Sequence, residues 1–289
     1  ATYSVTPNDT IRCVVRYEDA DLVLCDKQAH VVSTPGLGHE DDTLLNGLFA
    51  RYGAKLQKLG KARDFGLLHR LDRETSGLIV CALHAAAYDG LRAQFEARTV
   101  KKFYYAICGG TPRELSGVVR KPIVEVTGRE LGIKGGPRSS MKLAKISGRS
   151  HAGQASKQAV TAYRVLASGP MGSLIECRPV TGRLHQVRVH LEAIGAPIFG
   201  DDLYAPRAIA KGRSRLALHS HRMSFEHPIT GEKVDVKSPL PDGLKRLLTA
   251  LRLPTPGKMA EDEVKKNLEA SRQQTLESQD LDDGIEGEE

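Results

Sequence analysis

The sequence predicts a globular protein of the α+β class, with short strands and helices interspersed in one folded domain. Its 289 residues are 40% hydrophobic and 27% charged, an ordinary balance for a chain that buries a large core. Runs rich in β-branched and aromatic residues occur between runs with helical spacing, without a repeat of solenoid length. Because the composition does not change before about residue 254, we expect one folded domain over residues 1–254 and a separate segment over 255–289.

The first predicted elements are a β-hairpin and two helices. Ile11–Tyr17 and Leu22–Cys25 are strand-like runs joined by the acidic turn Glu18–Asp21. Residues 43–53 and 84–98 each place apolar side chains at helical spacing. Both are therefore predicted to be helices that face the core.

Three further strands follow. Lys101–Cys108 is β-prone and ends at a glycine pair, as a strand followed by a turn does. Tyr104 and Tyr105 must then face opposite sides of the sheet. Residues 158–167 and 173–178 again have strand character.

The segment Thr181–Leu191 predicts a turn and a helix after the last of these strands. Apolar residues recur at helical spacing, and Thr181 is placed as an N-cap. Arg183 would then project from the helix start, where backbone amides favour an anion, either a phosphate or the carboxylate of Asp72. A surface arginine in the first turn explains the spacing equally well.

The charge is divided between the body and the C-terminal segment. Residues 255–289 carry 4 Lys or Arg against 11 Asp or Glu, so this tail has a net charge of −7 and the other 254 residues carry +14. So basic a body indicates a polyanionic partner, with RNA or DNA the leading candidates. Residues 120–157 hold 9 basic and only 2 acidic residues, which indicates a flexible basic hairpin or loop over a nucleic acid, or a solvated insertion with no partner. The tail is predicted to be partly helical near 260–274 and otherwise disordered.

The segment His69–Gly77 contains the first candidate for chemistry. Asp72 lies between Arg70 and Arg73, just before the apolar run Leu78–Leu83. Two flanking guanidiniums favour the ionised carboxylate, and the β-rich run would hold the loop against a sheet. On local features alone, a carboxylate that only ties the loop together is the favoured interpretation.

Several other kinds of site lose support. The chain has no P-loop, no dinucleotide-binding glycine motif, no nucleophile elbow and no HExxH zinc motif. The five cysteines are scattered without CxxC spacing, and the histidine pairs lack a third ligand, so we expect neither a disulfide framework nor a metal site.

Nothing in the sequence indicates a membrane protein. No apolar stretch approaches the roughly 18 to 20 residues that span a bilayer, and the start lacks a secretory signal. We expect a cytoplasmic protein. Because the chain begins with Ala1, a mitochondrial or other organellar location after removal of a targeting segment is the alternative.

Separated segments resemble the RluA-type pseudouridine synthase family, and they occur in the family's order. They are Tyr17–Lys27, the Asp72 loop within His-Arg-Leu-Asp, Lys102-Phe103-Tyr104, Thr181–Gln186, Gly195–Asp201 and Leu216–His219. The resemblance implies a mixed, largely antiparallel curved central sheet with flanking helices and loops. Family-like sequence begins by residue 17, so no N-terminal S4 RNA-binding domain is expected.

The resemblance also implies a reaction and its residues. A uridine in rRNA or tRNA would be isomerised to pseudouridine without a cofactor or metal, after the base flips out of the RNA. Asp72 would be the essential carboxylate, either as a nucleophile on the ribose or as the base of an elimination. Tyr104 would stack on the target base, Arg183 would pair with Asp72, and Arg70 would fill the gap left by the base. The remaining expected substrate contacts are His69, Arg73, Lys102, His185 and Gln186.

Two other functions compete with this one. The first is an RNA-binding or ribosome-assembly factor on the same fold, which docks on assembly intermediates through the acidic tail. The second is a DNA glycosylase that uses Asp72 and releases free base. For the synthase, RNA is the expected partner and a monomer the expected state.

Overall fold

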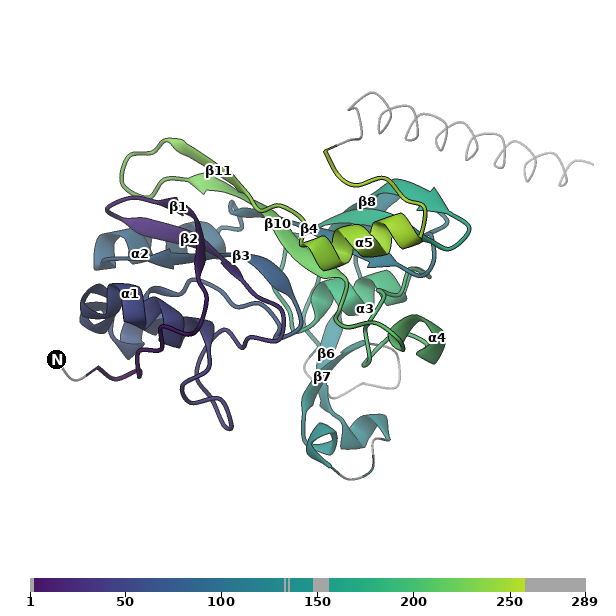
Figure 1. Cartoon of the computed structure of the whole chain (residues 1–289), viewed down its shortest axis with the longest axis horizontal. Helices are drawn as coiled ribbons and strands as arrows, with labels where there is room; N and C mark the ends of the chain where they lie inside the picture. Colours follow the sequence, from purple (N-terminus) through teal and green to yellow (C-terminus); the bar gives the residue numbers. More distant parts are fainter. Residues whose placement is uncertain (1–2, 133, 135, 148–155, 258–289) are drawn as a thin grey trace, which may run out of the picture.

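The computed structural model describes residues 3–132, 134, 136–147 and 156–257 (Figure 1). Its strands are β1 (Val14–Glu18), β2 (Leu22–Lys27), β3 (Ser76–Ala82), β4 (Lys101–Cys108), β5 (Ser116–Val119), β6 (Ile123–Thr127), β7 (Lys142–Ile146), β8 (Thr161–Gly169), β9 (Gly172–Pro179), β10 (Leu218–Glu226) and β11 (Lys233–Lys237). Its α-helices are α1 (Leu44–Leu59), α2 (Ala85–Glu96), α3 (Gln186–Glu192), α4 (Arg207–Ala210) and α5 (Asp242–Ala250). The predicted hairpin, the two N-terminal helices and the strand Lys101–Cys108 are confirmed.

Nine strands form one sheet in the order β1-β2-β3-β10-β4-β9-β8-β5, with β11 paired to β10. The pairing of β3 with β10 is parallel, and the other pairings within this sheet are antiparallel. Figure 1 shows α1 and α2 beside the β1–β3 half, and α3, α4 and α5 beside the other half. The α+β class with a mixed, largely antiparallel sheet is therefore confirmed.

Helix α1 is longer than predicted. Thr43 caps it, because its hydroxyl accepts a hydrogen bond from the Asn46 amide while the Asn46 side chain accepts one from the Thr43 amide. Buried side chains continue at helical spacing through Leu56 and Leu59, beyond the predicted end at residue 53. Gly60, with φ of 63°, ends the helix where its last turn is still packed on the core.

The parallel pair of β3 and β10 brings two backbones unusually close. Gly77 has φ of 114°, and a Cβ on it would lie 2.2 Å from the Ser220 carbonyl oxygen. Only glycine fits this close approach. Strand β3 begins at Ser76, two residues before the apolar run Leu78–Leu83. This pairing places the loop that precedes β3 at the middle of the sheet.

The basic segment 120–157 contains an ordered hairpin. Strands β6 and β7 form a separate two-stranded sheet that projects from the lower edge of the molecule in Figure 1. Val124, Val126 and Leu143 form its small core, against which Leu203 packs. The hairpin is thus confirmed over the described residues, and its contact with a nucleic acid stays a prediction. The tip and residues 148–155 are partly or wholly outside the described residues.

The C-terminal segment predicted from residue 255 lies outside the described residues after Gly257. Within the described part, no helix is long and apolar enough to cross a membrane.

Candidate active site

Asp72 lies on the loop that leads into β3, and the segment after β2 holds this loop by backbone contacts. Ser33 Oγ donates to the Leu71 carbonyl at 2.8 Å and accepts from the Leu71 amide at 3.1 Å. On the other side of Asp72, the His30 amide donates to the Arg73 carbonyl at 2.7 Å. The backbone is therefore fixed on both sides of Asp72, which restricts the direction of its carboxylate.

Lys27, the last residue of β2, lies beneath the same loop. Its Nζ donates to the carbonyls of Gln28 at 2.8 Å, Val31 at 2.6 Å and Arg73 at 3.1 Å. An ammonium has three N–H donors, and all three are used here. Burial lowers the pKa of Lys27 to about 7, although the negative charge of Asp72 opposes this shift. Lys27 thus ties the loop to the end of β2.

Two side chains at the start of α3 face the Asp72 carboxylate. Arg188 Nη1 lies 3.5 Å from Asp72 Oδ2, and His185 Nε2 lies 4.0 Å from the same oxygen. About a quarter of the Asp72 side chain is exposed. The carboxylate is thus open to a ligand on one side and faces a fixed cation on the other.

The predicted pairing of Arg183 with Asp72 is wrong. Arg183 Nε donates instead to the Gln158 carbonyl at 3.1 Å. The helix begins at Gln186, so Arg183 lies on the preceding turn and not in the first helical turn. Arg188, within the helix, is the guanidinium that faces inward. Arg70 and Arg73 are both exposed, and Arg73 pairs with Glu74.

Arg188 is held from two sides. Its Nε and Nη2 donate to the two carboxylate oxygens of Asp201 at 2.9 and 2.7 Å, and both side chains are 1% exposed. The ring of Tyr204 lies below it, with the guanidinium carbon 5.1 Å from the ring centroid. Within the described residues Nη1 has no hydrogen-bond partner, and it points to Asp72. The bidentate ion pair with Asp201 and the contact with the Tyr204 ring thus hold the Arg188 guanidinium so that its free Nη1 faces Asp72.

His185 links the cleft to strand β7. Its Nδ1 lies 2.6 Å from the Tyr204 hydroxyl, which accepts a hydrogen bond from the Ala144 amide at 2.9 Å. The hydroxyl proton is then directed at Nδ1, which assigns the proton of the neutral ring to Nε2, facing Asp72. Burial lowers the pKa of His185, and the charge of Asp72 opposes this shift. The backbone at His185 is left-handed, with φ of 48°, a strain common at functional sites.

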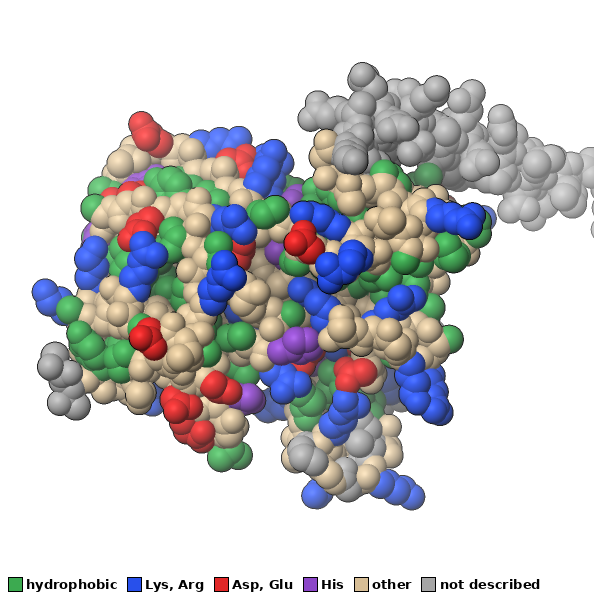
Figure 2. Space-filling model, viewed as in Figure 1, with side chains coloured by type: hydrophobic (Ala, Val, Ile, Leu, Met, Phe, Trp, Pro, Cys, Tyr) green, Lys and Arg blue, Asp and Glu red, His purple; other side chains and the backbone are tan. Residues whose placement is uncertain are grey.

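These groups open into a cleft of about 920 Å³. Its walls include the loop His69–Thr75, the turn before α3 and residues near the tip of the β6–β7 hairpin. Every residue that the sequence predicted for the site lines this cleft: His69, Arg70, Asp72, Arg73, Lys102, Tyr104, Arg183, His185 and Gln186. Figure 2 shows Lys and Arg side chains around the hollow between the two halves of this face.

Tyr104 and Tyr105 face opposite ways, as predicted. Tyr104 is buried at the floor of the cleft, where burial and the charge of Asp72 raise its pKa far above the ordinary value. Its phenol is therefore neutral at physiological pH. Tyr105 stacks on His221 with 3.5 Å between ring centroids.

Gln186 holds the turn before α3, in addition to lining the cleft. Its Oε1 accepts from the Thr181 hydroxyl at 2.7 Å and from the Arg183 amide at 3.1 Å. Its Nε2 donates to the Val160 carbonyl and the Thr161 hydroxyl. Both donors of its amide are used, so Gln186 supports the turn, while its contact with substrate stays a prediction. Thr181 is correspondingly not the N-cap of the helix, which is His185.

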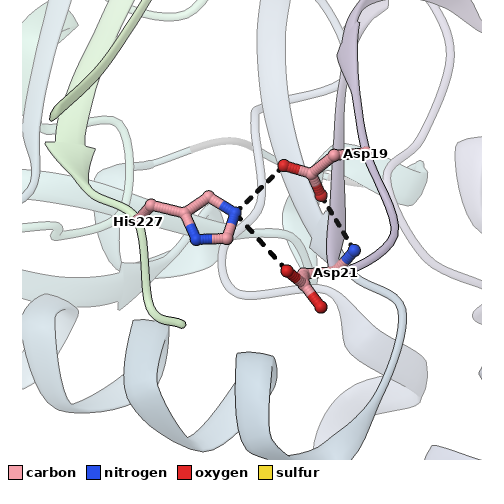
Figure 3. A group of neighbouring side chains, drawn as sticks. All are labelled: Asp19, Asp21 and His227. Atoms are coloured by element: carbon pink, nitrogen blue, oxygen red, sulfur yellow. Dashed lines mark hydrogen bonds and ion pairs between the residues drawn. The ribbon is translucent and has the colours of Figure 1, made fainter. Parts of the chain in front are cut away.

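One cluster within the described residues has the composition of a metal site (Figure 3). His227 Nε2 lies 3.0 Å from Asp19 and 3.8 Å from Asp21. His227 Nδ1, however, accepts from two backbone amides, so the proton of the neutral ring is on Nε2 and points at the carboxylates. A metal there would have to displace that proton. We therefore assign the cluster a structural role, which ties the β1–β2 turn to the segment after β10.

Comparisons with known proteins agree with this geometry. The family model of RNA pseudouridylate synthases matches residues 21–193. An uncharacterized RNA pseudouridine synthase of Synechocystis is 34% identical over 82% of this chain and 68% of its own length. The ribosomal large subunit pseudouridine synthase D of Zymomonas mobilis is 37% identical over 82% of this chain and 72% of its own length. The chain belongs to the RNA pseudouridylate synthase family.

Solved structures of the family have the same fold. Human RNA pseudouridylate synthase domain containing 4 is 25% identical, with a TM-score of 0.62 over 84% of this chain and 95% of that one. Human RNA pseudouridylate synthase domain containing 1 gives the same score and identity over 87% of this chain. The family resemblance inferred from the sequence is thus confirmed.

The residues that this synthase adds to the predicted site are Arg188, Asp201 and Tyr204. A signal for the first was present in the sequence, because an arginine between Val187 and Val189 in an apolar helix needs a buried carboxylate partner. Asp201 lies 13 residues further along. Nothing in the sequence pattern indicates which carboxylate that partner is, since the contact depends on the tertiary fold.

Lys27 makes a testable contribution to the pH dependence of stability. The pKa of about 7 in the folded synthase lies below the unfolded value of about 10.4, so the unfolded chain binds more protons between these pH values. The free energy of unfolding should therefore gain about 2 kcal/mol from this group between pH 7 and pH 9. Denaturant unfolding at both pH values would show this gain in the wild type but not in Lys27→Met. Equal pH slopes in the two proteins would contradict it.

Proposed function

We propose that this synthase isomerises a uridine of large-subunit ribosomal RNA, with Asp72 as its catalytic carboxylate. The observation that carries the proposal is the position of Asp72, which lies on a clamped loop in the cleft opposite the fixed guanidinium of Arg188. The relatives named for ribosomal large subunit modification support rRNA as the first candidate substrate. A transfer RNA is the second.

In this proposal the glycosidic bond from N1 to C1′ breaks, the uracil turns while it is held, and C5 forms the new bond to C1′. C5 then loses its proton and N1 gains one, so that the product is an isomer of the substrate. Asp72 acts either as the nucleophile at the ribose or as the base that starts an elimination, and the geometry is compatible with both routes. Arg188 orients the carboxylate. Tyr104, neutral and buried at the cleft floor, offers its ring to the uracil.

The target uridine has to leave its stack to reach Asp72. A cleft of about 920 Å³ is large enough for an extruded nucleotide. Arg70 is exposed at its edge, which suits a side chain that fills the gap in the RNA. Extrusion costs a few kcal/mol, which contacts to phosphates must offset.

Carbodiimide mapping of pseudouridine in total RNA tests the proposal. The RNA would come from cells with the protein, without it, and with Asp72→Asn. We expect one or a few uridines, first among them in large-subunit rRNA, to be modified only with the intact protein. Identical maps in all three would favour the binding-factor alternative, and a change confined to transfer RNA would reassign the substrate.

The β6–β7 hairpin should supply affinity for RNA. Lys142 and Lys145 are exposed on β7, and residues near the hairpin tip line the cleft. Reversing both charges should weaken RNA binding and make it less dependent on salt. The slope of log affinity against log salt concentration should become less steep by about 0.7–0.9 for each phosphate that the protein no longer neutralises. Binding titrations at several salt concentrations would measure this slope.

The matched control reverses Lys233 and Lys237, which are also exposed and lie on β11 at the opposite side of the view in Figure 1. This change alters the net charge of the protein by the same amount. If both double variants lose the same affinity, the hairpin has no specific contact with RNA and only the overall charge acts.

A further inference from the structure

A second, smaller pocket opens beside the cleft. Its volume is about 310 Å³, and it lies between the end of α2, strand β4 and the turn before α3. His69, Lys102, Thr181 and Arg183 line both cavities. A polymer with one residue at Asp72 can therefore place a neighbouring residue in this pocket.

The charges in the two cavities differ. Asp72, Glu74 and Asp202 line the cleft together with its cations. The charged residues that line the side pocket are Arg98, Lys102 and Arg183, with no carboxylate among the lining residues. His69 adds no charge, because burial lowers its pKa well below the ordinary value. The pocket thus has a net positive charge that nothing in its own walls compensates.

The three cations retain donors for a ligand. None of them has an ion pair in the described part of the chain, and Arg183 uses only its Nε on a carbonyl. The Lys102 ammonium lies 5.5 Å from the centroid of the Phe95 ring, and burial lowers its pKa to about 8. Lys102 is half-buried and its ammonium has no paired anion within the described residues, so it is available to bind one.

Arg98 lies in the turn that ends α2. This residue has φ of 59°, a left-handed conformation in which glycine is the least strained residue. Backbone bonds close this turn, from the Arg98 amide to the Phe95 carbonyl at 3.2 Å and from the Thr99 amide to the Gln94 carbonyl at 3.0 Å. The turn uses only the backbone of Arg98, and Arg98 lines the pocket.

We propose that this side pocket binds the backbone phosphate and ribose of the nucleotide adjacent to the target uridine. The proposal rests on the proposed function for the position of that uridine. Arg98, Lys102 and Arg183 contact the phosphate, while the apolar wall of Leu68, Phe95 and Val100 contacts the sugar. The volume is at the lower end for ligand pockets, which suits one nucleotide and excludes a duplex.

The test is a double-mutant cycle on RNA affinity. It combines protein variants with RNAs in which a single phosphate linkage has been replaced by an uncharged one. Fluorescence anisotropy would measure the affinity of the full chain for an RNA with one uridine, in which each phosphate in turn is replaced by methylphosphonate. We expect Lys102→Met to weaken binding of the unmodified RNA by about tenfold, the loss of one charge-assisted hydrogen bond. It should have no further effect once one particular phosphate next to the uridine is neutral.

Lys101→Met is the matched control, because Lys101 precedes Lys102 on β4 and its exposed side chain is on the opposite face. Its effect should be small and additive with every methylphosphonate. If the effect of Lys102→Met is also additive at every position, Lys102 acts only through long-range charge and the proposal is overturned.

Arg98→Gly separates binding from folding. Because glycine relieves the left-handed strain, the thermal midpoint should stay the same or rise while RNA affinity falls. A lower midpoint with unchanged affinity would give Arg98 a structural role and overturn its assignment.

Competition with uridine 5′-monophosphate completes the test. If Lys102→Met abolishes mononucleotide binding but leaves RNA affinity intact, the pocket binds free nucleotides and not RNA. These affinities do not depend on turnover, so they are informative even if no uridine is isomerised.

Discussion

Asp72→Asn should abolish turnover and leave RNA affinity nearly intact. The change removes the carboxylate that is partly exposed in the cleft and faces Arg188 Nη1, and we expect a loss of at least about 10²–10⁴-fold. RNA binding should stay the same or tighten slightly, because a negative charge leaves a cleft that holds a polyanion. Single-turnover assays and binding titrations on the mapped RNA would measure the two effects separately.

Glu74→Gln is the matched control for Asp72→Asn. Glu74 belongs to the same loop, lines the same cleft and is paired with Arg73, so its neutralisation removes an equal charge but leaves in place the Asp72 carboxylate that Arg188 Nη1 faces. Most of the turnover should remain. If Glu74→Gln is as inactive as Asp72→Asn, the assignment of chemistry to Asp72 fails, and a large loss of RNA affinity in Asp72→Asn would give Asp72 a binding role.

Arg188→Met should be inactive and unstable. It leaves the buried Asp201 carboxylate without its bidentate partner, which costs about 3–5 kcal/mol, and it removes the cation opposite Asp72. Such a loss corresponds to a fall of about 10 °C in the thermal midpoint for a domain of this size. Calorimetry and the same turnover assay would test the two parts.

A double variant distinguishes the two roles of Arg188. Arg188→Met with Asp201→Asn removes the uncompensated charge and keeps an oxygen that can accept from the amides of Leu203 and Tyr204. Most of the lost stability should return, whereas activity should not. If activity returns together with stability, Arg188 serves only to hold the fold.

The sequence predicted local elements well where the spacing of apolar residues directly indicates which side chains are buried. The strand Lys101–Cys108 has the predicted bounds, and the opposite directions of Tyr104 and Tyr105 follow from its alternation. It was less successful where tertiary contacts override local preference. The helix predicted from Thr181 begins only at Gln186, because the Gln186 amide side chain satisfies the turn that a capping threonine would otherwise close.

Asp72 could be identified from the sequence because its motif consists of consecutive residues of one short loop. The cation that faces Asp72 could not be identified in this way. Arg183 and Arg188 are five positions apart, and only the packing of α3 against Asp201 decides which of them reaches Asp72. The basic body and the family resemblance indicated RNA, whereas the side pocket arises only where α2, β4 and the turn before α3 converge. Composition and motifs depend on covalent order, but which cation faces which anion depends on contacts between segments far apart in the chain.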